Sequence, residues 1–143
     1  MGGEGGGAER GEVEGLLATA VNGSQADACG LNISNFGNSV KQLSIEVVEA
    51  LRPLVPRIRR HDRSLADQLV RAASSVALNI AEGEHSDPGN RKARFYSAAG
   101  SANETLAALK VAVAWGYFAA PEAEVAAGML RRVIGMLWKL TRG

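Results

Sequence analysis

Small residues dominate two neighbouring stretches of this chain, and they constrain its fold more than any other feature does. Residues 71–83 read Arg-Ala-Ala-Ser-Ser-Val-Ala-Leu-Asn-Ile-Ala-Glu-Gly, and residues 100–104 read Gly-Ser-Ala-Asn-Glu. The apolar residues fall on the spacing of a helix face. Because small side chains let helix axes approach closely, the two stretches predict tightly packed helices.

Helical periodicity extends over four segments, which cover residues 40–60, 64–83, 88–115 and 121–142. In each segment apolar residues recur three and four positions apart, which predicts one buried face per helix. The expected inner residues are Leu43, Val47, Ala50, Leu51, Leu54 and Ile58 in the first segment; Leu65, Leu69, Ala72, Ala73, Val76 and Ile80 in the second; Phe95, Ala102, Leu106, Leu109 and Val113 in the third; and Val125, Met129, Val133, Met136, Leu137 and Leu140 in the fourth.

The boundaries of these helices follow from residues with known preferences at helix ends. Pro53 and Pro56 interrupt the first segment and predict that its helix is bent or broken there. The other boundary residues are Ser64 as an N-cap with Asp67 three residues on, Gly83 as a C-cap, Asp87 and Pro88 as an N-cap and a first helical residue, Gly116 as a stop and Pro121 as a start.

Four amphipathic helices with short connections predict an all-α, antiparallel up-down-up-down four-helix bundle over residues 41–143. No segment shows the alternation of a strand. A chain of 143 residues can build one domain with a real core and is too short for two ordinary ones.

Residues 1–40 differ from the rest in composition. They contain ten glycines, five acids (Glu4, Glu9, Glu12, Glu14 and Asp27) and a single basic residue, Arg10. Residues 41–143, by contrast, contain fifteen Lys or Arg and ten acids. Such a segment buries too little apolar surface to order itself, so we expect a flexible acidic extension. The alternative is a short helix over residues 13–21 that docks on a partner.

No apolar run is long enough to span a membrane, and the N-terminus lacks the pattern of a secretory signal. Cys29 is the single cysteine, which excludes an internal disulfide framework. We therefore expect a cytoplasmic bacterial protein without a membrane partner.

Cations gather at one end of the predicted bundle. The up-down order brings together the start of the first helix, the start of the third and the end of the fourth. The expected nucleic-acid-binding residues there are Lys41, Arg91, Lys92, Arg94, Lys139 and Arg142, with Glu82, Glu84 and Asp87 as counter-charges. Phosphate contacts or an ordinary solvated bundle end would both explain this rim. At the opposite end, Arg57, Arg59, Arg60, His61 and Arg63 are expected to serve the helix terminus, where cations are favourable.

Polar and small residues form outward stripes on three of the helices. We interpret them as an oligomer interface, in which arginine–glutamate pairs within or between subunits fix the register. Asn79 is expected to bridge backbone groups inside the bundle. The expected interface residues are Arg71, Ser75, Leu78, Glu82, Ser101, Glu104, Arg131 and Trp138.

Several quoted stretches resemble a known family. Residues 65–69, 71–76, 79–83 and 91–95, with Gly100, Ser101 and Glu104, are similar to the four-helix-bundle family first described from proteins encoded in intervening sequences of bacterial 23S ribosomal RNA genes. That family is related in fold to the accessory protein of diversity-generating retroelements. The resemblance covers about residues 40–142; it departs at Ala77, where proline is common. It implies a homopentameric ring, no catalytic residues, and a role in binding nucleic acid or protein.

Searches for catalytic patterns are negative. No Glu-x-x-His pair suits a di-iron bundle, and His61, His85 and Cys29 do not form a convincing zinc set. Arg57 and His61 are separated by three residues, too few for a bundle ribonuclease of the HEPN type. We therefore expect no cofactor and no catalysis.

The function that we expect is an oligomeric adaptor that binds RNA or DNA, a nucleic-acid enzyme such as a reverse transcriptase, or both. A purely protein-binding module whose N-terminal tail engages a partner is the alternative, and an RNA-cleaving enzyme is the least favoured.

Overall fold

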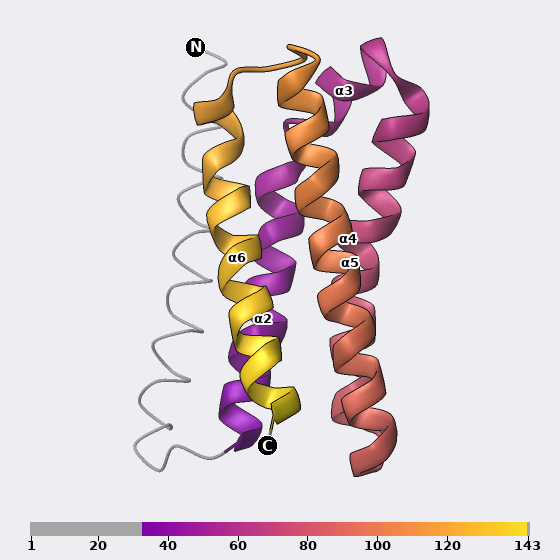
Figure 1. Ribbon diagram of the computed structural model, residues 1–143, viewed down its shortest axis with the longest axis vertical. Helices are drawn as coiled ribbons and strands as arrows, with labels where there is room; N and C mark the ends of the chain where they lie inside the picture. Colours follow the sequence, from indigo (N-terminus) through magenta and orange to yellow (C-terminus); the bar gives the residue numbers. More distant parts are fainter. Residues whose placement is uncertain (1–32, 143) are drawn as a thin grey trace, which may run out of the picture. The chain divides into compact units, whose positions relative to one another are not determined.

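A computed structural model describes residues 33–142, which form five helices and no strand. The helices are α2 (Ile33–Leu51), α3 (Val55–His61), α4 (Arg63–Glu84), α5 (Pro88–Ala114) and α6 (Ala120–Arg142), as Figure 1 shows. The expected extension over residues 1–40 lies mostly outside the described residues, and so does the alternative helix at residues 13–21. The first helix begins at Ile33 rather than at Val40, because a single glycine such as Gly37 costs a helix only about 1 kcal/mol.

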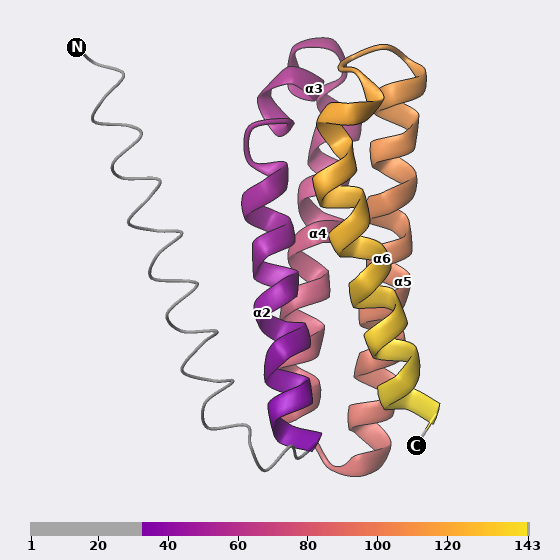
Figure 2. The ribbon, with the colours of Figure 1, turned by 90° about the vertical axis from the view of Figure 1, so that its left-hand side faces the viewer.

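The four long helices run side by side and reverse direction from one to the next (Figures 1 and 2). One end of this bundle holds the start of α2, the α4–α5 turn and the end of α6. The other end holds α3 and the α5–α6 loop. The predicted all-α bundle is confirmed.

The predicted interruption of the first helix is confirmed at Pro53, whereas Pro56 lies inside the first turn of the next helix and does not interrupt it. α2 ends at Leu51, and α3 begins at Val55 with a proline in its first turn. Pro53 has no backbone N–H to continue the ladder of α2, whereas Pro56 sits where a helix needs none. Leu54 donates its backbone N–H to the Leu51 carbonyl at 2.9 Å, which tightens the connection. The sequence therefore produces a separate seven-residue helix across the end of the bundle.

Two expected boundaries of the second helix are wrong. Asp62, not Ser64, caps α4: its Oδ1 accepts from the Leu65 N–H at 2.9 Å, from an extended backbone conformation. Asp67 instead forms an ion pair with Arg59. Gly83 is not a C-cap, because α4 continues to Glu84. An added Cβ on Gly83 would lie 2.6 Å from Phe95 Cε1, so this glycine permits close approach of α4 and α5.

The ends of α5 and the start of α6 follow the sequence expectations closely. Asp87 caps α5 by accepting from the Asn90 N–H at 3.0 Å, and Pro88 opens the helix. This hydrogen bond is the main reason that the pKa of Asp87 lies below its usual value. Gly116, at φ +80°, turns the chain directly after α5. α6 begins one residue before Pro121.

The core lies between the four long helices, with α3 closing one end. Its largest fully buried side chains include Ile58, Leu69, Ile80, Leu109, Leu130 and Leu137. Nearly all predicted inner residues are buried or partly buried, but Val125 is 65% exposed and its assignment is wrong. α6 instead turns Ala123, Ala126 and Ala127 inward, because its first turns pack too closely for larger side chains.

Candidate functional site

The predicted cations do gather at one end of the bundle. The first turns of α5 and the last turn of α6 lie there (Figures 1 and 2), and Lys41, eight residues into α2, reaches the same end through Glu84 of α4. We call these six cations the basic end: Lys41, Arg91, Lys92, Arg94, Lys139 and Arg142. Three acids stand on the neighbouring turns, namely Glu82, Glu84 and Asp87. The basic end therefore keeps an excess of three positive charges.

Half of these cations have partners within the chain. Lys41 forms an ion pair with Glu84 at 3.1 Å, which ties α2 to the end of α4. Arg94 pairs with Glu82 at 3.0 Å, and Arg91 donates from Nε to the Gly83 carbonyl at 3.3 Å. By contrast, the exposed side chains of Lys92, Lys139 and Arg142 take part in no ion pair within residues 33–142.

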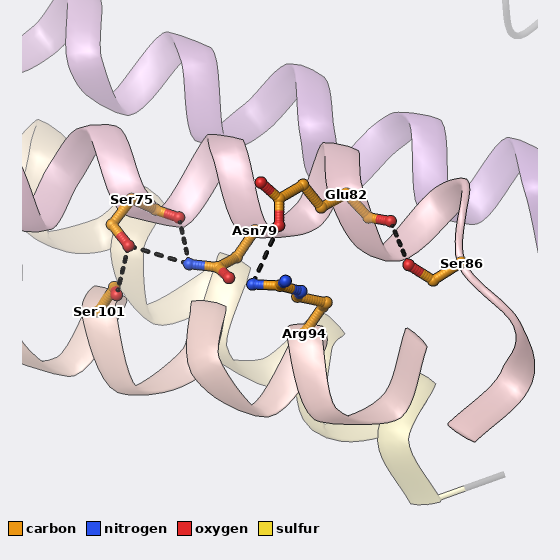
Figure 3. A network of polar contacts seen from close by, with 6 residues as sticks. All are labelled: Ser75, Asn79, Glu82, Ser86, Arg94 and Ser101. Atoms are coloured by element: carbon orange, nitrogen blue, oxygen red, sulfur yellow. Dashed lines mark hydrogen bonds and ion pairs between the residues drawn. The ribbon is translucent and has the colours of Figure 1, made fainter. Parts of the chain in front are cut away.

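The polar stripes of α4 and α5 face each other along one seam, drawn in Figure 3. Ser101 Oγ donates to Ser75 Oγ at 3.1 Å, and Asn79 Nδ2 donates to the Ser75 backbone carbonyl at 2.9 Å, as expected for a bridging amide. The Arg94–Glu82 pair continues the seam toward the basic end. Ser75, Ser101 and Glu82, which the sequence assigns to an oligomer interface, thus have partners inside the chain.

The remaining predicted interface residues are exposed. Leu78 is 63% exposed on α4. Arg71 and Glu104 take part in no ion pair among the described residues. On α6, Arg131 pairs with Glu124. The Trp138 ring stands edge-on to Tyr96 of α5 at 5.7 Å between centroids and stays 41% exposed.

At the other end, α3 is fixed to the α5–α6 loop. The His61 ring stacks on Tyr117 at 4.8 Å between centroids, and the Arg57 guanidinium lies 5.8 Å from the Phe118 ring centre. Arg57 also donates to Glu122, which lowers the pKa of the Glu122 carboxyl and raises the pKa of the arginine. These contacts support the structural role that the sequence assigns to this end.

Trp115 lies at this same end of the bundle, next to the α5–α6 loop, and the sequence predicts no role for it beyond the last turn of the third helix. Its side chain is 70% exposed. Its position just before the helix-ending Gly116 is the sequence signal that could have drawn notice, since a helix terminus often lies at the surface.

The described residues contain no group of three or more His, Cys, Asp or Glu that could hold a metal ion; Cys29 lies outside them. No helix within residues 33–142 is long and apolar enough to cross a membrane.

Comparisons with known proteins agree with this architecture. A search of curated proteins found no match. Among solved structures, a protein of unknown function from the S23 ribosomal protein family of Bacteroides thetaiotaomicron is similar in fold, with a TM-score of 0.66 and 20% sequence identity over 73% of this chain and 99% of that one. The model of the 23S rRNA-intervening sequence protein family matches residues 37–139, which include the whole bundle from the first turns of α2 to the last turn of α6. This chain is a member of the 23S rRNA-intervening sequence protein family.

Proposed function

We propose that this protein is a non-enzymatic, cytoplasmic adaptor that assembles with copies of itself and binds nucleic acid through the basic end. The observation that carries the proposal is the excess of positive charge at that end, contributed by residues of α2, α5 and α6. Phosphate groups are the ligands that such a surface attracts without base-specific contacts.

A purely structural role explains Lys92 poorly. It lies in the first turns of α5, where the helix dipole disfavours a positive charge, and it forms no ion pair within residues 33–142. Lys139 and Arg142, in the last turn of α6, do complement the dipole of their helix. All three side chains are nevertheless open to a phosphate backbone.

The test is a binding titration of RNA and DNA at several salt concentrations. The variant Lys92→Ala/Arg142→Ala should bind more weakly and with a weaker salt dependence. The negative slope of log K against log salt should become shallower by about 2, since each phosphate contact contributes about −0.9 on a duplex. The matched control, Lys110→Ala/Arg132→Ala, removes one exposed lysine and one exposed arginine from other parts of α5 and α6. If both variants lost the same affinity, the basic end would not be the binding surface. If no binding were detected at low salt, the nucleic-acid function itself would be wrong.

Self-association is proposed for the outer faces of the helices. Three glycines there, Gly100, Gly128 and Gly135, have no neighbour within 4 Å of an added Cβ, so packing within the chain does not require them. Since each costs its helix about 1 kcal/mol relative to alanine, close approach of another subunit is a physical reason for them. Arg71 and Glu104 supply opposite charges for such a contact. The assembly that we propose is the homopentameric ring.

Leu78 gives the sharpest test of assembly, because its exposed side chain can be changed without disturbing the core. Leu78→Glu should shift the protein toward the monomer in light scattering at micromolar concentration, since a charge in an apolar contact is costly. Ile45→Glu is the control, because Ile45 is an exposed apolar side chain of α2, a long helix on which no interface residue is proposed. A wild-type monomer would contradict the assembly, and dissociation by both variants would contradict this interface.

A further inference from the structure

Trp115 is the most exposed of the large apolar side chains in the described bundle, at 70%. Its contribution to the end of α5 is made by its backbone, whose N–H bonds to the Val111 carbonyl at 3.0 Å. The indole ring is therefore not needed for the helix terminus. A tryptophan left in water forgoes a large hydrophobic gain, and its exposed ring is free to stack on a ligand.

The surroundings of Trp115 are fixed by contacts between α3 and the α5–α6 loop. Tyr117, two residues after Trp115, stacks on His61, the last residue of α3. Arg60 precedes His61, and Arg63 opens α4 two residues later. The tryptophan and these arginines therefore lie on the same end of the bundle (Figure 2), which we call the α3 end.

Within residues 33–142, most basic residues of the α3 end are arginines, with Lys110 in the last turns of α5 as the one lysine; the arginines are Arg52, Arg57, Arg59, Arg60 and Arg63. Arg57 and Arg59 are held by Glu122 and Asp67. Arg52, Arg60 and Arg63 are exposed and form no ion pair within residues 33–142. Arginine binds phosphate through two parallel hydrogen bonds and also stacks on flat rings, so it suits nucleic acid better than lysine does.

We propose that the α3 end binds single-stranded nucleic acid, with a base stacked on Trp115 and with Arg60 and Arg63 on the flanking phosphates. The inference rests on the proposed nucleic-acid function and adds the strand type and a second contact, at the end opposite the basic end. A base inside a duplex has no free face, whereas a single strand can offer one to an exposed indole. A protein partner fits less well, because it would have to desolvate three arginines on the same end of the bundle that form no ion pair within residues 33–142.

The ring stack and the Arg57 contacts make this end a preformed platform. They fix α3 against the α5–α6 loop, so Arg60 of α3 and the chain that follows Trp115 keep their relative positions when a strand arrives. A site ordered in advance loses less conformational entropy on binding.

The chain contains only two tryptophans, which makes a direct test simple. Trp138→Phe leaves Trp115 as the one indole, at the α3 end, and Trp115→Phe leaves Trp138 on the last turns of α6. Oligothymidylate added at low salt should quench the fluorescence of the Trp138→Phe protein, and a duplex of the same length should quench it far less. Binding is followed independently by the anisotropy of a labelled strand.

Two substitutions measure the affinity. Trp115→Ala should raise the Kd for the strand about tenfold, the usual effect of losing one base–aromatic stack. Arg60→Ala should raise the Kd and reduce its salt dependence, while Arg132→Ala, which removes an exposed unpaired arginine from α6, should leave both unchanged. All three side chains are exposed, so circular dichroism should show intact helices.

The outcomes separate the two proposals. If the strand binds but leaves Trp115 unquenched, or quenches Trp138 alone, the proposed site at the α3 end is wrong. The proposed binding of nucleic acid at the basic end would still stand. Equal quenching by duplex overturns the stacked base. Absence of binding in the anisotropy measurement overturns both proposals.

Discussion

Gly83→Leu is expected to destabilise the bundle by about 3 kcal/mol or more, because overpacking at a close helix contact forces both helices apart. An added Cβ alone would stand 2.6 Å from Phe95 Cε1 and 2.9 Å from Phe95 Cδ1. Phe95 is 4% exposed and cannot swing away without disturbing the core. On the other side, Arg94 Cβ would lie at 3.3 Å. A domain of this size has about 5–15 kcal/mol in total, so the loss should be plain in urea unfolding.

Gly89→Leu is the matched control for Gly83→Leu. Gly89 lies in the first turn of α5, where an added Cβ would meet only Asp87 Oδ1 at an ordinary 3.6 Å. This substitution should change the free energy of unfolding by less than about 1 kcal/mol, since leucine has the better helix propensity. If Gly83→Leu were as stable as Gly89→Leu, the close approach of α4 and α5 at this position would be wrong.

Gly83 also shows where prediction from the sequence stops. A glycine at the end of a helical pattern is predicted to be a C-cap, because that preference depends only on the local backbone conformation. The structure keeps Gly83 inside α4, for a reason that lies twelve residues away in Phe95. Asp87 and Pro88 were predicted correctly because their effect is local: a carboxylate that accepts from a nearby N–H, and a ring that fixes φ.

The error at Val125 has a related cause. Periodicity finds large apolar residues and gives alanine little weight, yet the inner face at the start of α6 is made of alanines. Helices that pack closely bury their small residues and leave a larger one outside. The same abundance of alanine that predicts tight packing therefore hides the inner face at the start of α6 from an analysis of large apolar residues.

For the candidate site, the topology was predictable and the pairings were not. Up-down connections bring Lys41, Arg91 and Lys139 to one end whatever their side chains do. The cations that are free to bind a phosphate are those without an acidic partner. Such partners come from distant parts of the sequence, as in the Lys41–Glu84 pair, whose residues are 43 positions apart. The exposure of Trp115 was missed because helical periodicity assigns faces along a helix and says nothing about which side chains are covered at its end.

Ile58→Ala is the second substitution with a large expected effect, and it bears directly on the α3 end. Ile58 is fully buried and is the only buried residue of α3. Truncation of a fully buried isoleucine to alanine costs about 2–5 kcal/mol, through lost apolar burial and the cavity left behind. A helix of seven residues is far too short to persist without such packing. Urea unfolding should show the loss, and Ile58→Val should show about 0.5–1.5 kcal/mol on the same scale.

The way in which this energy is lost matters more than its size. If Ile58 fixes α3 to the bundle, amide exchange in Ile58→Ala should become faster in α3 at denaturant concentrations where α4 and α5 still exchange slowly, as expected for local opening. Arg60→Ala, an exposed position on the same helix, should leave these rates unchanged. Detachment of α3 would separate Arg60 from Trp115, so the strand-induced quenching of Trp115 should weaken together with α3 protection. Uniformly faster exchange in all helices would show instead that α3 is part of the global folding unit, and quenching would then persist up to the unfolding transition.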